Sequence, residues 1–157
     1  MRGGVPFGAM SRTEHAGILL VIVQFALLGW LIWPFTEQAW TPPALALVGS
    51  AVILGAWTLI HNRPGNFNIH PEPRPSGRMV TGGPYRYVRH PMYSAVLLFA
   101  AAETLAYADP WKVVCSVVLA AVLAAKAMLE ERRLRELYAD YAEYAARVRS
   151  RLIPGIY

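Results

Sequence analysis

Residues 81–93 read TGGPYRYVRHPMY, and a long apolar segment follows directly after them. These residues include two glycines, two prolines, three tyrosines, two arginines and one histidine. Glycine and proline mark turns and loops. Proline also suits the first position of a helix, where its missing N–H would have no intrahelical partner. We therefore expect a tight loop that ends at His90 and a helix that begins at Pro91.

The apolar segment after this stretch is one of four in a strongly hydrophobic chain. Apolar residues make up 55% of the 157 residues and charged residues only 16%, against about 25% charged in a typical soluble domain. Apolar runs at about 17–35, 43–60, 92–108 and 111–129 are each close to the length that crosses a bilayer as a helix. We therefore predict one all-α integral membrane domain over residues 1–157, with four transmembrane helices.

Basic residues gather on one side of the predicted membrane. The loop at 61–91 and the chain after Leu129 are rich in arginine, whereas the connection between the first two spans has no basic residue. Because basic loops are retained in the cytoplasm, we expect both termini and the 61–91 loop to be cytoplasmic. This pattern accounts for the net charge of +5, so we do not expect nucleic acid as a partner.

The residue pattern changes after Glu130. Apolar side chains, among them Tyr138, Tyr141 and Tyr144, recur every three or four residues, and charged residues fill the positions between them. This spacing predicts an amphipathic helix at 130–150 whose apolar side lies in the cytoplasmic interface of the lipid bilayer. A helix that only anchors the chain on anionic lipid is an equally simple interpretation.

The first group of residues with binding chemistry lies at the predicted start of the third span. The backbone N–H groups of Met92 and Tyr93, together with the helix dipole, would form an anion site. Arg86 or Arg89 would clamp a carboxylate or phosphate there. The tyrosines of the loop would stack on a flat ring or face a cation. The alternative is an ordinary belt of arginine and tyrosine at a helix end.

The second group is Lys126, Glu130 and Glu131 at the cytoplasmic end of the fourth span. Lys126 and Glu130 are four residues apart and share one helix face. The predicted topology brings this group close to Pro91. An anion site, an aromatic wall and two carboxylates suit a zwitterionic ligand with an extra positive charge. The alternative is a helix end at the point where the chain leaves the bilayer.

Other polar residues are expected to have structural roles. Glu103 in the third span would either extend to the membrane surface or pair with Lys112. Gln24 would make a hydrogen bond between helices. The histidines have no tight ligand spacing and no cysteine partner, so we predict no metal site.

The run at 83–93, with Arg-His-Pro-x-Tyr at its end, and the later Glu130-Glu131 pair resemble the isoprenylcysteine carboxyl methyltransferase and phospholipid methyltransferase superfamily. The resemblance implies a multi-pass enzyme that binds S-adenosylmethionine between membrane helices and its C-terminal segment. The cofactor site that we predict from it consists of Gly83, Tyr85, Arg89, His90, Pro91, Tyr93, Glu130 and Glu131.

Two positions depart from the prenylcysteine enzymes of this superfamily. The arginine that those enzymes place one helical turn before the glutamate is Lys126 here, and a histidine that they carry eight residues before the tyrosine is Gly77. These two differences do not affect the cofactor prediction, but they leave the identity of the methyl acceptor undetermined. We predict Arg89 and Lys126 as the catalytic residues that orient an acceptor or cofactor carboxylate.

The predicted function is S-adenosylmethionine-dependent methyl transfer at the cytoplasmic membrane face, by in-line displacement in a partly desolvated site. The acceptor is a lipophilic or small membrane-partitioning carboxylate, thiol or amine. Two alternatives stay open. One is a membrane reductase with a nicotinamide cofactor, since sterol reductases share a similar C-terminal architecture. The other is a non-catalytic membrane anchor or partner-binding protein.

Overall fold

The computed structural model describes residues 12–33, 40–62, 79–107 and 109–156. Gly77 and most of the predicted 61–91 loop therefore lie outside the described residues. Within the described parts the chain is helical and has no strand. The elements are α1 (Arg12–Ile32), α2 (Pro42–Asn62), the 3-10 helix η1 (Gly83–Arg86), α3 (Pro91–Tyr107), α4 (Pro110–Leu137) and α5 (Tyr141–Arg147).

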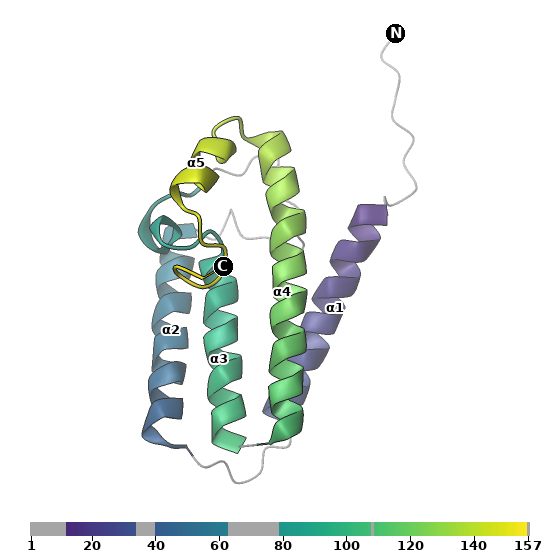
Figure 1. The fold of residues 1–157 in the computed structure, drawn as a ribbon, viewed down its shortest axis with the longest axis vertical. Coiled ribbons are helices and arrows are strands. Elements are labelled where there is room, and N and C mark those ends of the chain that lie inside the picture. The colour runs from purple at the N-terminus through teal and green to yellow at the C-terminus, as the bar shows by residue number, and fades with distance from the viewer. Residues whose placement is uncertain (1–11, 34–39, 63–78, 108, 157) are drawn as a thin grey trace.

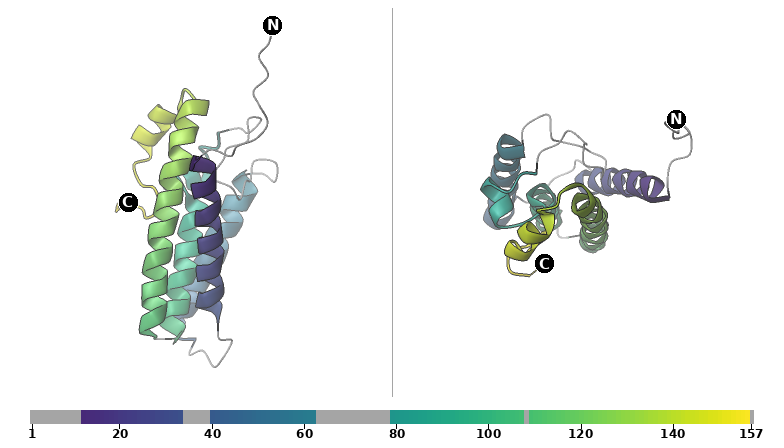
Figure 2. Two further views of the ribbon diagram at one scale, coloured as in Figure 1. Left: turned by 90° about the vertical axis from the view of Figure 1, so that its right-hand side faces the viewer. Right: turned by 90° about the horizontal axis from the view of Figure 1, so that it is seen from above.

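The four long helices lie side by side and alternate in direction (Figures 1 and 2). Helix α2 packs against α3, α1 against α4, and α3 contacts α4. The C-terminal end of α2, the start of α3 and the end of α4 meet at one end of the bundle, beside η1 and α5 (Figure 1). We call this the site end. Helix α1 meets α4 at the opposite end and diverges from it toward the site end (Figure 1).

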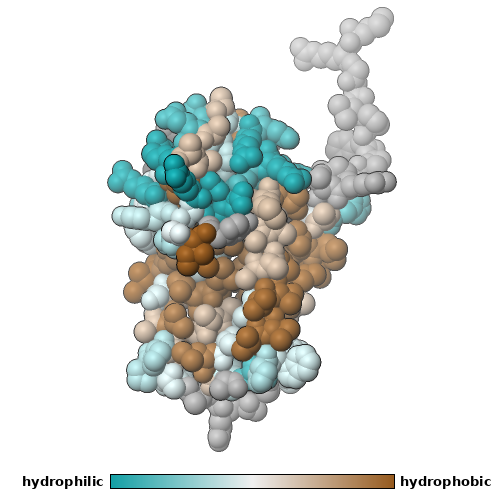
Figure 3. Space-filling view, in the orientation of Figure 1, coloured by the Kyte–Doolittle hydropathy of each residue, from teal (hydrophilic) through white to brown (hydrophobic). Residues whose placement is uncertain are grey.

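The surface of the bundle is that of a membrane protein. Three helices are long and apolar enough to cross a membrane, at His15–Ile32, Pro42–Asn62 and Pro110–Leu137. Helix α3 has 17 residues, so the number of four spans stays a prediction. On the face that Figure 3 shows, apolar side chains form a band across the middle of the molecule, which we call the apolar belt, and hydrophilic ones cover the site end. Soluble monomers rarely expose a continuous apolar surface of this kind.

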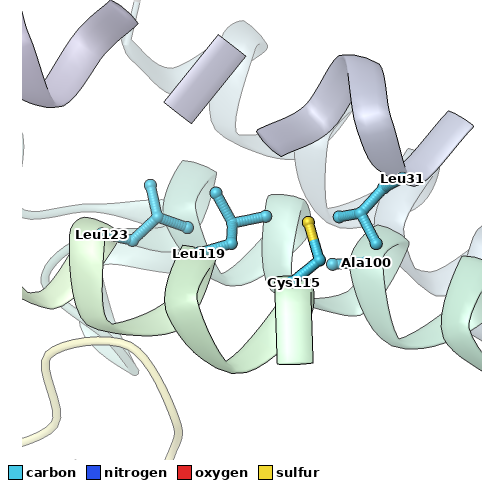
Figure 4. Close-up of a cluster of buried hydrophobic side chains, with 5 residues drawn as sticks. All are labelled: Leu31, Ala100, Cys115, Leu119 and Leu123. Carbon is cyan, nitrogen blue, oxygen red and sulfur yellow. The ribbon is translucent and has the colours of Figure 1, made fainter. Parts of the chain in front are cut away.

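A cluster of apolar side chains joins α1, α3 and α4 near the end opposite the site (Figure 4). Its buried members are Leu31, Ala100, Cys115, Leu119 and Leu123. On the other flank, the small residues of α2 allow a close approach to α3. A Cβ added at Gly55 would meet the Cβ of Ala95 at 3.9 Å. These contacts fix α3 between its neighbours and thereby place its first turn.

The start of α4 is set by local sequence. Asp109 is the residue before the helix, and its side chain accepts a hydrogen bond from the backbone N–H of Trp111 at 2.9 Å. Pro110 then occupies the first position, as is common at helix starts. The helix continues to Leu137, well beyond the predicted end of the fourth span at residue 129.

The predicted amphipathic helix at 130–150 is wrong in its bounds and in its surroundings. Residues 130–137 belong to α4, and α5 is a separate helix of 7 residues. Tyr141, Tyr144 and Val148 are buried and pack against Met79 and Leu134. The apolar side that we assigned to lipid is therefore covered by the protein itself. The periodicity showed that this apolar side must be shielded from water. It did not show whether lipid or protein would shield it.

The polar residues of the bundle are held by other helices. Gln24 accepts a hydrogen bond from Nζ of Lys126 at 2.5 Å, which confirms the predicted contact between helices. Lys112 donates to the carbonyls at the end of α1, including that of Trp33 at 2.8 Å. Glu103 is only 3% exposed, and its Oε2 has no hydrogen-bond partner among the described residues. It does not extend to water, so that prediction for Glu103 was wrong. Its charge interacts with that of Lys112, in agreement with the other alternative.

Gly83 begins η1 with a backbone that favours glycine. Its φ is +58°, and a Cβ at this position would lie 2.3 Å from the ring of His61. We predict that Gly83→Ala lowers the free energy of unfolding by about 1–3 kcal/mol, measured by thermal denaturation in detergent.

Gly82→Ala is the matched control. Gly82 has an ordinary φ of −94°, and nothing lies within 4 Å of its added Cβ. Its melting temperature should equal that of the wild type. Adding His61→Ala to Gly83→Ala should recover only part of the loss, because it removes the clash and leaves the backbone strain. A fully stable Gly83→Ala protein would contradict this account.

Candidate functional site

The loop that ends at His90 is held in place by the C-terminal tail. The backbone N–H of Arg89 donates to the carbonyl of Ser150, and that of His90 donates to the carbonyl of Arg151, both at 3.0 Å. The hydroxyl of Ser94 donates to the carbonyl of Leu152. Helix α3 begins at Pro91, as predicted. The tail is therefore bound along the loop and the first turn of α3.

His90 lies between the two glutamates of α4. Its Nε2 is 3.3 Å from Oε1 of Glu131, and its Nδ1 is 3.5 Å from Oε2 of Glu130. The Tyr93 ring stacks on the imidazole with 5.4 Å between centroids and an interplanar angle of 7°. The loop and α4, which are distant in sequence, thus meet at this histidine. This geometry confirms that the two predicted groups of residues come together.

Glu131 is the centre of a closed ion cluster. Its side chain is 2% exposed and lies 2.9 Å from Nε of Arg89. Nε of Arg151 donates to both carboxylate oxygens, at 3.2 Å and 3.3 Å. The contact of Nε with Glu131 is an ion pair, and the hydrogen bonds of the Arg89 side chain are made by Nη1, which donates to the carbonyls of Ala145 and Val148, each at 3.2 Å. These bonds join the loop, α4, the end of α5 and the tail around one carboxylate.

Glu130 has a different environment from that of its neighbour. Its side chain is 31% exposed, and Oε2 accepts a hydrogen bond from the hydroxyl of Tyr93 at 3.2 Å. Adjacent residues of an α-helix point about 100° apart, so one carboxylate faces the ion cluster and the other faces outward. Glu130 is therefore the carboxylate that a ligand can reach.

Lys126 lies one helical turn before Glu130 and is 3% exposed. Its Nζ donates to Gln24 and lies 5.2 Å from the centre of the Tyr93 ring. Helix α1 therefore contributes Gln24 to the site, although we did not predict Gln24 as a site residue. The available signal was a single amide side chain in an otherwise apolar run.

The remaining predicted residues shape the loop. Tyr85 belongs to η1, and its backbone carbonyl accepts a hydrogen bond from the hydroxyl of Tyr144 at 2.8 Å. The prediction that the backbone N–H of Tyr93 is a free donor of an anion site at the start of α3 is wrong. The N–H of Tyr93 is not free, because it donates to the carbonyl of His90 at 3.0 Å.

The carboxylates determine the charge of His90. Burial disfavours the charged imidazolium, but hydrogen bonds and attraction to Glu130 and Glu131 outweigh it and raise the pKa of His90 above its ordinary value. With a carboxylate at each ring nitrogen, the protonated ring donates in both directions. Burial, with the nearby charge of Glu130, raises the pKa of Tyr85. Tyr85 therefore stays neutral.

An apolar helical bundle with a cluster of charged side chains at one end of its helices defines a membrane protein with a polar site at that end. The family model for phospholipid methyltransferases matches residues 44–141. This is more than half of the chain, and the chain belongs to that family. The matched stretch includes all of the predicted site residues. A search of curated proteins found no match.

The raised pKa of His90 makes stability depend on pH. The folded protein holds the proton more tightly than the unfolded chain, so this stabilisation is complete below the unfolded pKa of about 6.5. It is lost as pH rises through the higher folded value. We predict that the melting temperature of wild type exceeds that of His90→Gln most at acidic pH, and that the difference shrinks toward alkaline pH.

The measurement is a series of thermal melts of both proteins from about pH 5.5 to about pH 9. Glutamine keeps a hydrogen-bonding side chain but cannot carry the charge, so the difference between the curves reports the proton. A difference that stays constant over this range would show that His90 is not protonated between the two carboxylates.

Proposed function

We propose that the protein transfers a methyl group from S-adenosylmethionine to a lipophilic or small membrane-partitioning acceptor at the cytoplasmic face of the membrane. Membership of the phospholipid methyltransferase family supports methyl transfer. The observation that carries the cofactor assignment is the open carboxylate of Glu130, which is 31% exposed in a cluster whose other acidic group is closed. Such a carboxylate suits an ammonium group or the hydroxyls of a ribose.

The residues beside Glu130 fit the rest of such a ligand. Tyr93 and Tyr85 supply aromatic surface, which attracts a cation through the ring face. Tyr93 also orients the carboxylate through its hydroxyl. Glu131 and Arg89 are bound to each other and to the tail. We therefore assign both of them to positioning the site.

When bound, the cofactor supplies an electrophilic methyl carbon, whose bond to sulfur breaks as a lone pair of the acceptor bonds to it. The chain's part is positioning and desolvation. Lys126 is almost fully buried, so an acceptor that reaches it leaves water and meets an Nζ group that Gln24 holds in place. Lys126 therefore orients an anionic acceptor. Such an acceptor requires no general base.

The first test separates this function from a nicotinamide-dependent reductase. Isothermal calorimetry on detergent-solubilised protein should show binding of S-adenosylmethionine and none of NADPH. Glu130→Gln should weaken S-adenosylmethionine binding roughly 10- to 100-fold, as expected when a hydrogen bond to a charged group is lost. Its melting temperature should fall less than that of Glu131→Gln, because this carboxylate is partly exposed and loses only its contacts with His90 and Tyr93. Heat from NADPH alone would favour the reductase.

Glu131→Gln is the matched control on the adjacent residue. It removes the acidic partner of Arg89 and Arg151 from a buried cluster, so it should lower the free energy of unfolding by roughly 3–5 kcal/mol. If Glu130→Gln were the more destabilising variant, the assignment of the two carboxylates would be reversed.

The second test concerns the acceptor. Labelled-methyl transfer to prenylcysteines, aminophospholipids and small thiols identifies the best acceptor. With that acceptor we predict that Lys126→Met lowers kcat/KM roughly 10- to 100-fold. The Kd of S-adenosylmethionine should change little, because Lys126 faces the acceptor. A large rise in that Kd would instead place the lysine on the cofactor.

A further inference from the structure

The C-terminal turn, which we define as residues 153–156, exposes two large apolar side chains. Ile153 is 44% exposed and Ile156 is 80% exposed. The turn is closed by a hydrogen bond from the N–H of Ile156 to the carbonyl of Ile153 at 3.1 Å. The N–H of Gly155 also donates to the hydroxyl of Ser150 at 2.9 Å. Two isoleucines are thus held at the surface by an ordered turn.

The position of the turn along the bundle follows from its neighbours. The carbonyl of Leu152 accepts from Ser94, which lies in the first turn of α3. The chain has therefore passed His90 and lies beside the first turn of α3 when the C-terminal turn begins. At this level the hydrophilic surface of the site end gives way to the apolar belt (Figure 3).

The apolar residues of α5 and the residue after it are not exposed on this surface. Tyr141, Tyr144 and Val148 are inside the protein. The exposed isoleucines, by contrast, follow Leu152, which is bound at the first turn of α3. Other large apolar side chains of the bundle are also exposed, such as Leu105 near the opposite end of α3 at 45%. In a membrane protein the apolar belt faces hydrocarbon.

We propose that the C-terminal turn inserts Ile153 and Ile156 into the acyl region of the lipid bilayer at the site end of α3, and that this contact holds the tail against the ion cluster. The link between the two is short. Ile153 is two residues after Arg151, which binds Glu131 and whose carbonyl accepts from the N–H of His90. Lipid contact at one side of the tail thereby supports the closed carboxylate at the other.

The first measurement is the depth of the turn in the membrane. In a Cys115→Ala background, a spin label on Ile156→Cys is examined in phosphatidylcholine nanodiscs with oxygen and a water-soluble nickel chelate as relaxing agents. The label should be relaxed more by oxygen than by the chelate, as a label at Leu105 of the apolar belt should be. A label at the exposed Arg149 provides the water-facing reference.

The second measurement tests the link to the site. In nanodiscs, Ile153→Asn with Ile156→Asn should raise the hydrogen-exchange rate of the loop around His90 at least about tenfold, because its partner carbonyl on the tail is released. Leu137→Asn is the matched control, since Leu137 is 49% exposed and lies outside the tail. A label at 156 that behaves like the one at 149 would overturn the proposal. Unchanged exchange in the double variant would overturn it as well.

Discussion

The ion cluster around Glu131 is the interaction on which the site depends. One carboxylate with almost no exposure holds Arg89 from the loop and Arg151 from the tail, and it lies against His90. A buried carboxylate without cations would cost several kcal/mol. The cluster is therefore stable only when loop, α4 and tail are all in place. A single residue thus makes assembly of the site cooperative, and the same closure leaves Glu130 as the carboxylate with an open edge.

The sequence was sufficient for the elements that local chemistry determines. Apolar runs located the long helices, and His90 followed by Pro91 located the start of α3. The arginine pattern and the helix ends together placed the loop beside the end of α4, and the contacts of His90 with Glu130 and Glu131 confirm this. The long helices and the helix start were predicted correctly because both follow from composition within one segment.

The sequence was insufficient for features that depend on tertiary packing between distant segments. The pattern after Glu130 gave an apolar side, but not that it would pack against Met79 and the loop instead of lipid. In the same way, two adjacent glutamates are equivalent in a sequence. Their different roles arise from the rotation between neighbouring helical positions and from the arginines that other segments bring to one of them.

The contact between Lys126 and Gln24 extends the site to a helix that the motif does not include. Lys126 has three N–H donors, and Gln24 accepts one of them. Helix α1 diverges from α4 toward the site end (Figure 1). The amide of Gln24, which orients this lysine, therefore belongs to the helix that lies farthest from the others at that end. Movement of α1 would therefore change the direction of the lysine charge without disturbing the ion cluster of Glu131. The chain thus separates two tasks. Under the proposed function, loop, α4 and tail would hold one end of a ligand, and α1 and α4 would determine what can approach the other end from the membrane.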